Sequence, residues 1–160
     1  MKTKLRIISL FLLIAVALSG LVGCSGETVS DEGTASIVVE NRDGSFSLYE
    51  ADLSLLESYD RGALSVLEYL GKKKDGITYS VSFGGGYGGY VNSIGSLSPA
   101  GNEYVAIYTT EACDFAVATE YMPTVSTAEY NGRTLTYSGV GVSEMAVKDK
   151  TVILFRIESF

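Results

Sequence analysis

The 160-residue sequence contains no histidine and no tryptophan, and only two prolines. Without histidine, neither a Ser-His-Asp nor a Cys-His arrangement can form, and the usual type of zinc site is excluded. Basic residues are also few, with 12 Lys and Arg against 19 Asp and Glu, a formal net charge of −7. An acidic surface repels phosphate backbones. We therefore expect neither a histidine-dependent enzyme nor a nucleic-acid partner.

The first 23 residues have the pattern of an export signal. A basic start precedes an apolar run, Ile7–Leu18, that is too short for a stable membrane span. The following "LVGC", residues 21–24, resembles the bacterial lipobox, which implies cleavage before Cys24 and a lipid on its sulfur. The alternative is an ordinary secretory signal followed by an accidental cysteine. We expect an extracytoplasmic protein anchored to the cell membrane through Cys24.

Removal of residues 1–23 leaves 137 residues and takes away three basic groups, so the net charge becomes −10. This length suits one domain with its own core. Residues 24–33, "CSGETVSDEG", are mostly small, polar and acidic. They predict a lipidated cysteine with a flexible tether, and residues 34–160 are then the folded domain.

One helix stands out among segments that otherwise have strand character. Within residues 61–76, apolar side chains recur at i, i+3, i+4 and i+7 and line one face, formed by Ala63, Val66, Leu67 and Leu70. Asn131-Gly132 is the strongest hairpin signal in the chain. Strands are expected at residues 34–40, 45–53, 77–83, 103–110, 114–119 and 151–159. This order predicts an α+β domain in which one helix covers a mostly antiparallel sheet.

The segment "SFGGGYGGYVNSIGSL", residues 82–97, contains an unusual run of glycines and tyrosines. Gly84 to Gly89 formally fits G-x-G-x-x-G, but the residues that follow lack a helical period and a Lys-Ser/Thr pair. A phosphate-binding loop needs the amino end of a helix and, in a P-loop, that Lys-Ser/Thr pair. We therefore reject a phosphate-binding role for this run. We interpret the run as an ordered loop with positive φ angles or close backbone approach. It then either packs within the protein or faces a ligand.

Paired carboxylates could in principle carry out glycoside chemistry. The nearest cluster in sequence is Glu111, Asp114 and Glu120, which would have to converge in a cleft to act on glycans. Spacing alone does not show such convergence, so we expect these groups to be solvated. No calcium loop of the EF-hand kind is present. The residues therefore predict no catalytic site, no metal site and no cofactor.

Four segments stand in an order that resembles a known family. They are "ALSVLEYL" (63–70), "GGYVNSIGSL" (88–97), "GNEYVAIYT" (101–109) and "YNGRTLTYSGVGVSEMAVKDKTVILFRI" (130–157). From about residue 37 to residue 157 the chain resembles an uncharacterised bacterial domain family related to the C-terminal β domain of transcobalamin and intrinsic factor. The resemblance implies a β-grasp-like fold and a role in binding rather than catalysis.

The same resemblance locates a ligand-binding surface. Carried over by position, this surface is formed by Tyr87, Tyr90, Asn92 and Ser93. The implied ligand is a small molecule such as cobalamin or another corrinoid, with a transporter or surface protein as partner. The chain departs from the family at residues 105–108, where the usual tryptophan is missing, and it lacks the helical barrel of the cobalamin carriers. The alternative is a surface interaction or adhesion module that recognises a protein or a polysaccharide.

Overall fold

A six-stranded sheet forms the centre of residues 29–160, which are the residues described by the computed structural model. Its strands are β1 (Thr34–Glu40), β2 (Phe46–Asp52), β5 (Glu103–Thr109), β6 (Thr127–Tyr130), β7 (Arg133–Tyr137) and β8 (Val152–Ser159). Their order is β2-β1-β8-β5-β7-β6. β1 runs parallel to β8, and the other neighbouring pairs are antiparallel.

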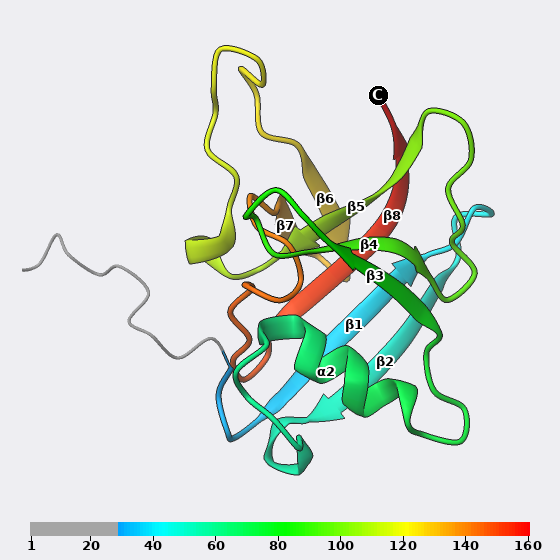
Figure 1. Ribbon diagram of the computed structural model, residues 1–160, viewed down its shortest axis with the longest axis vertical. Coiled ribbons are helices and arrows are strands. Elements are labelled where there is room, and N and C mark those ends of the chain that lie inside the picture. The colour runs from blue at the N-terminus through cyan, green and yellow to red at the C-terminus, as the bar shows by residue number, and fades with distance from the viewer. Residues whose placement is uncertain (1–28) are drawn as a thin grey trace, which may run out of the picture.

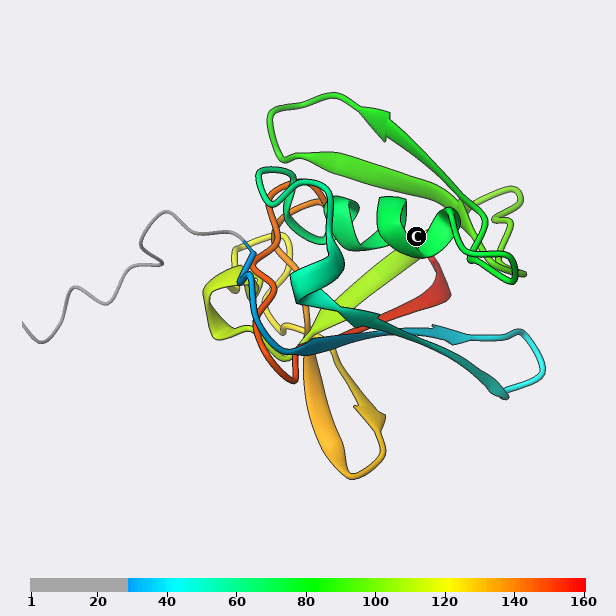
Figure 2. The ribbon, with the colours of Figure 1, turned by 90° about the horizontal axis from the view of Figure 1, so that it is seen from below.

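One helix and a separate hairpin cover one side of this sheet (Figures 1 and 2). The helix is α2 (Gly62–Gly71), and the hairpin consists of β3 (Tyr79–Phe83) and β4 (Gly89–Ile94). Figure 2 shows α2 between the sheet and the hairpin, while the β6–β7 end of the sheet extends to the other side. Short 3₁₀ turns follow β2 and β5, at η1 (Leu53–Leu55) and η2 (Ala112–Asp114). The predicted α+β class, with one helix on a mostly antiparallel sheet, is confirmed.

The apolar pattern of the sequence explains how these layers pack. The predicted helix face is buried in full, because Ala63, Val66, Leu67 and Leu70 are all at most 2% exposed. In β1, alternate side chains enter different cores, as expected for a strand with period 2. Ile37 and Val39 meet the helix side, whereas Val38 packs on the opposite face with residues of β5, β7 and β8. The central strands are therefore buried on both faces.

The Asn131-Gly132 signal forms the turn between β6 and β7, as predicted. Both residues have positive φ, 47° and 72°, which is the backbone shape of the tight hairpin turn that matches strand twist. The sheet also curls: Phe46 at the start of β2 meets Tyr130 at the end of β6 edge to face, with ring centroids 5.2 Å apart. The two outermost strands thus approach each other.

Two predicted elements differ from the structure. Residues 114–119 do not form a strand: Asp114 ends η2, and Phe115 makes an isolated bridge to Ser138. Conversely, residues 89–94 are the strand β4, where we expected a loop. Glycine, asparagine and serine have a weak strand propensity. The segment is a strand because its backbone pairs with β3.

The amino-terminal predictions fall mostly outside the described residues. The signal peptide of residues 1–23 and the lipid site Cys24 lie there. The structure describes the end of the predicted tether, where Val29 is buried and forms a bridge with Val147. From Val29 onward the chain therefore packs against the domain. Among residues 29–160, no helix is long and apolar enough to span a membrane.

Candidate functional site

A groove of about 630 Å³ lies between the β3–β4 hairpin and the sheet. We call it the tyrosine groove, because its aromatic lining consists of Tyr87, Tyr90, Tyr104, Tyr137 and Phe160. Most of the remaining lining is apolar or glycine, and Glu103 is its one acidic or basic side chain. The volume is within the roughly 300–1,000 Å³ typical of small-molecule sites. Concave shape, aromatic walls and few charges make it the candidate binding site.

The hairpin wall depends on the glycine run. Gly85, Gly86 and Gly88 have φ angles of 72°, 76° and 91°, which L side chains rarely adopt. The run ends against the 139–142 segment, where the Gly141 N–H donates to the Tyr87 carbonyl over 2.6 Å. A Cβ on Gly141 would lie 2.4 Å from the Gly89 carbonyl oxygen. The glycines therefore allow two backbones to touch, as the close-approach interpretation requires.

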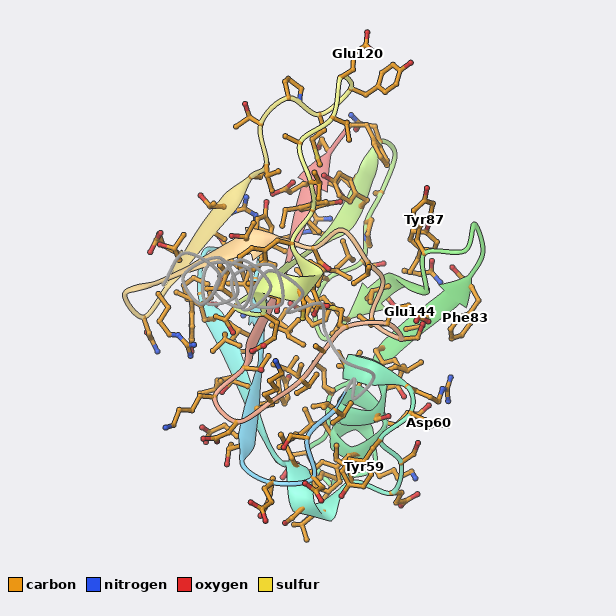
Figure 3. The ribbon with its side chains drawn as sticks, turned by 90° about the vertical axis from the view of Figure 1, so that its left-hand side faces the viewer. Tyr59, Asp60, Phe83, Tyr87, Glu120 and Glu144 are labelled. Atoms are coloured by element: carbon orange, nitrogen blue, oxygen red, sulfur yellow. The ribbon has the colours of Figure 1, made fainter. Side chains whose placement is uncertain are left out.

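This backbone contact leaves the neighbouring aromatic rings facing outward. Tyr87 is 63% exposed and Tyr90 46% exposed. In Figure 3, Tyr87 and Phe83 project from the hairpin, away from the body of the domain. No helix follows the glycines, because β4 begins at Gly89, and this agrees with the rejection of a phosphate loop. The backbone of the glycine run thus packs against the 139–142 segment, while the rings of Tyr87 and Tyr90 line the solvent-exposed rim of the groove.

Three of the four predicted ligand-binding residues come together here. Tyr87, Tyr90 and Asn92 line the tyrosine groove. Asn92 also accepts a hydrogen bond from the Ser82 hydroxyl over 3.0 Å, which orients its amide. Ser93 pairs with Ser80 of β3 and is not part of the groove lining. The hairpin has a bulge at Asn92, because Ser80 pairs with Ser93 and Val81 pairs with Val91, and the sequence alone did not indicate it.

The sheet wall is held by a polar network at the ends of β5 and β8. Tyr104 and Tyr108 both donate hydroxyl hydrogen bonds to Glu158, the former over 3.0 Å. Arg156 donates to Glu158 from Nε over 2.8 Å and lies over the Tyr108 ring. Burial and the Glu158 hydrogen bond raise the pKa of Tyr108 to about 12 and also raise that of Tyr104. Tyr104, whose ring stacks on Phe160 with centroids 4.7 Å apart, is thus a fixed neutral wall.

The charged lining residue Glu103 is already paired. Its carboxylate accepts from the Arg42 guanidinium over 2.6 Å and from the Ala100 N–H over 2.9 Å. The hydrogen bond from Arg42, followed by that from Ala100, lowers the pKa of Glu103 to about 2. The groove therefore offers little unpaired charge to a ligand.

The predicted carboxylate cluster does not form a catalytic pair in this groove. Asp114 is 5% exposed and accepts from the Ala146 N–H over 2.8 Å, while Glu111 accepts from the Thr151 hydroxyl. Figure 3 shows Glu120 at one extreme of the molecule. The expectation of solvated acids is correct for Glu120 and wrong for Asp114, which burial holds at a raised pKa of about 6. Asp114 and Glu111 instead anchor the 146–151 segment.

A second, more polar hollow of about 380 Å³ lies on the other side of the glycine run. Asp60, Phe83 and Glu144, labelled in Figure 3, border it together with Arg61 and Ser143. The Ser143 hydroxyl accepts from the Gly89 N–H over 2.9 Å and so supports the hairpin. Within residues 29–160, no group of three or more acidic or cysteine side chains is placed to hold a metal ion.

Sequence reasoning missed the sheet side of the groove. Tyr104, Tyr137 and Phe160 come from three separate parts of the chain, and no motif connects them. Val105 and Ile107, at the groove floor, looked like ordinary core positions of a strand. The unusual tyrosine content, 11 of 160 residues, is the one signal that could have pointed to an aromatic site.

Comparisons with known proteins establish the fold but no family. No protein-family model and no curated protein matches the chain. The fold is similar to the crystal structure of a protein from Ruminococcus gnavus ATCC 29149, described as a "putative metal binding protein". The TM-score is 0.50 at 11% sequence identity, over 81% of this chain and 99% of that chain. The class defined by fold and site is thus an α+β domain with an aromatic groove.

Proposed function

We propose that this protein is a lipid-anchored extracytoplasmic binding protein that captures a small ligand in the tyrosine groove, without catalysing a reaction. The observation that carries the proposal is the convergence of Tyr87 and Tyr90 from the hairpin with Tyr104, Tyr137 and Phe160 from the sheet side. Tyrosine rings provide rigid flat area with a polar tip, which suits macrocycles and rings with polar substituents. Asn92 adds a fixed amide beside them.

The ligand class we favour is a corrinoid, on the basis of the transcobalamin-like segments. The strand order also supports a β-grasp-like relationship. In the four strands β2-β1-β8-β5, a parallel central pair joins an amino-terminal hairpin to the carboxy-terminal strands, and α2 connects the two halves. The resemblance implies that the groove covers one face of the ring, so a transporter or another surface protein would supply the opposite face.

Calorimetric titration of the full-length protein in detergent with cobalamin, and with cobinamide, which lacks the nucleotide tail, tests this ligand class. We expect saturable binding that Tyr90→Ala weakens at least tenfold, a loss of about 1.4 kcal/mol. Phe83→Ala is the matched control, because Phe83 is an exposed aromatic residue of the same hairpin that does not line the groove. Equal losses in both variants, or no heat at millimolar ligand, would refute the corrinoid assignment.

The lipid anchor has its own test. Mass spectrometry of the protein extracted from membranes should find a mature chain that begins at a diacylglyceryl-modified Cys24, and Cys24→Ala should release the protein from the membrane fraction. A chain that keeps residues 1–23, or a Cys24 without the diacylglyceryl group, would contradict the anchor.

A surface interaction module that recognises a protein or a polysaccharide is the second candidate. It is favoured by the aromatic residues that the hairpin leaves exposed, because Phe83, Tyr87 and Tyr90 are each at least 46% exposed. It predicts a complex that can be isolated with the membrane-bound protein and is lost when these three residues are replaced by serine. Corrinoid binding without such a complex would eliminate it.

A further inference from the structure

The floor of the tyrosine groove is an open strand edge, and hydrogen bonds at both ends of β5 define its orientation. The Thr110 N–H donates to the Val152 carbonyl over 3.1 Å, and the Phe160 N–H donates to the Asn102 carbonyl over 3.0 Å. In an antiparallel pair, residues alternate between bonding to the partner and pointing away from it. Even-numbered residues from 102 to 110 therefore bond toward β8, and the odd-numbered residues point to the opposite edge.

β7 covers that opposite edge only at its far end. Its pairing with β5 is limited to Tyr108 and Thr109, and the Ser138 N–H then donates to the Ile107 carbonyl over 2.8 Å. Beyond residue 138 the chain leaves the sheet to meet the hairpin. This leaves the N–H and C=O of Val105 and the N–H of Ile107 facing the groove. Within residues 29–160, no loop or side chain forms a hydrogen bond with these three groups.

A buried main-chain donor or acceptor without a hydrogen-bond partner is unfavourable by about 1–3 kcal/mol. A ligand that forms hydrogen bonds with these three groups is therefore favoured in the groove. Val105 and Ile107 are only 8% and 9% exposed, so their edge is recessed. The hairpin on one side and the segments of Ala116, Met122 and 138–141 on the other form walls. A second sheet could not lie flat against this edge, whereas one extended chain could.

We propose that the tyrosine groove binds an extended peptide segment by adding it as a strand to β5, beside residues 103–107. The inference rests on the proposed function in one respect, that this groove is the binding site. Alternating N–H and C=O groups two residues apart, about 7 Å along a strand, match the spacing of a peptide backbone. The apolar lining and the paired Glu103 favour uncharged side chains in the groove. The net charge of −10 that remains without residues 1–23 favours basic residues beside it.

The test uses a six-residue probe that alternates valine and threonine between two terminal lysines and is blocked at both ends. Strand addition orients alternate peptide N–H groups toward β5. Two isomers are therefore compared, one N-methylated at residues 2 and 4 and the other at residues 3 and 5. With the full-length protein in detergent, fluorescence anisotropy should show that one isomer binds like the parent while the other binds at least tenfold more weakly. Equal affinities of the two isomers would overturn strand addition.

A protein variant tests the same edge from the other side. Val105→Pro removes the outward N–H and leaves the even-numbered bonds to β8 in place, as proline is tolerated where its nitrogen faces away from the ladder. We expect it to weaken the parent probe at least tenfold, with Val105→Ile as the control. If Val105→Pro does not fold, the isomer pair with the wild-type protein decides.

If Tyr90→Ala abolishes probe binding while the two isomers bind with equal affinity, the groove is still the binding site and only strand addition to β5 is refuted. Absence of both probe and cobinamide binding would instead refute the groove itself.

Discussion

Asp114 offers a quantitative test of how the 146–151 segment is held against the domain. Asp114 is 5% exposed, and burial raises the pKa of its carboxyl group from the ordinary 3.8 to about 6, although the Ala146 N–H acts in the opposite direction. A rise of this size corresponds to ~3 kcal/mol of free energy. Nearby Glu111 raises the pKa further, and Lys148 partly offsets it.

The sign follows from proton binding. Because the folded state binds the Asp114 proton more tightly than the unfolded state, raising the pH from about 4 through about 6 lowers the free energy of unfolding. The loss is complete above that range. Asp114→Asn keeps an oxygen for the Ala146 N–H and cannot ionise. Relative to wild type, this variant should therefore gain ~2.5 kcal/mol of stability between pH 4 and pH 7.5.

Urea unfolding of the wild type and the variant at steps of pH measures this difference. Glu120→Gln serves as the control, since it neutralises an exposed carboxylate of the following loop and should track the wild type at each pH. A difference between Asp114→Asn and wild type that stays constant from pH 4 to pH 7.5, or that changes in the other direction, would refute the reasoning.

Two further predictions concern the walls of the groove. Gly141→Ala should lower the free energy of unfolding by ~2 kcal/mol or more, because the new Cβ meets the Gly89 backbone. Gly84→Ala, in open space without positive φ, should change it by less than about 0.5 kcal/mol, and equal effects in urea unfolding would contradict the close-approach argument. Tyr108→Phe should lower the melting temperature through a loss of ~1 kcal/mol, since the Arg156–Glu158 pair remains. An unchanged melting temperature of Tyr108→Phe would mean that Glu158 does not need the hydrogen bond from the Tyr108 hydroxyl.

Local patterns predicted the elements whose stability is mostly local. The i, i+3, i+4, i+7 face of α2 and the Asn131-Gly132 turn both appear where expected, because each depends on neighbours within one turn of chain. The segment 114–119 has apolar residues but no strand partner along its length, so its strand character is not realised. β4 is the reverse case: poor strand formers are held by β3 on one edge and by Val142 and Ser143 on the other.

The sequence by itself determined the α+β class, the buried helix face and the outward tyrosines of the glycine run, because these follow from periodicity and backbone freedom. Only the tertiary structure decided that β1 lies parallel to β8 and that the hairpin forms a sheet of its own. It also decided that Tyr90 faces one groove with Tyr104 and that the edge of Val105 stays open. These features depend on contacts between segments far apart in the chain, and their register is set by the packed core and by no local pattern.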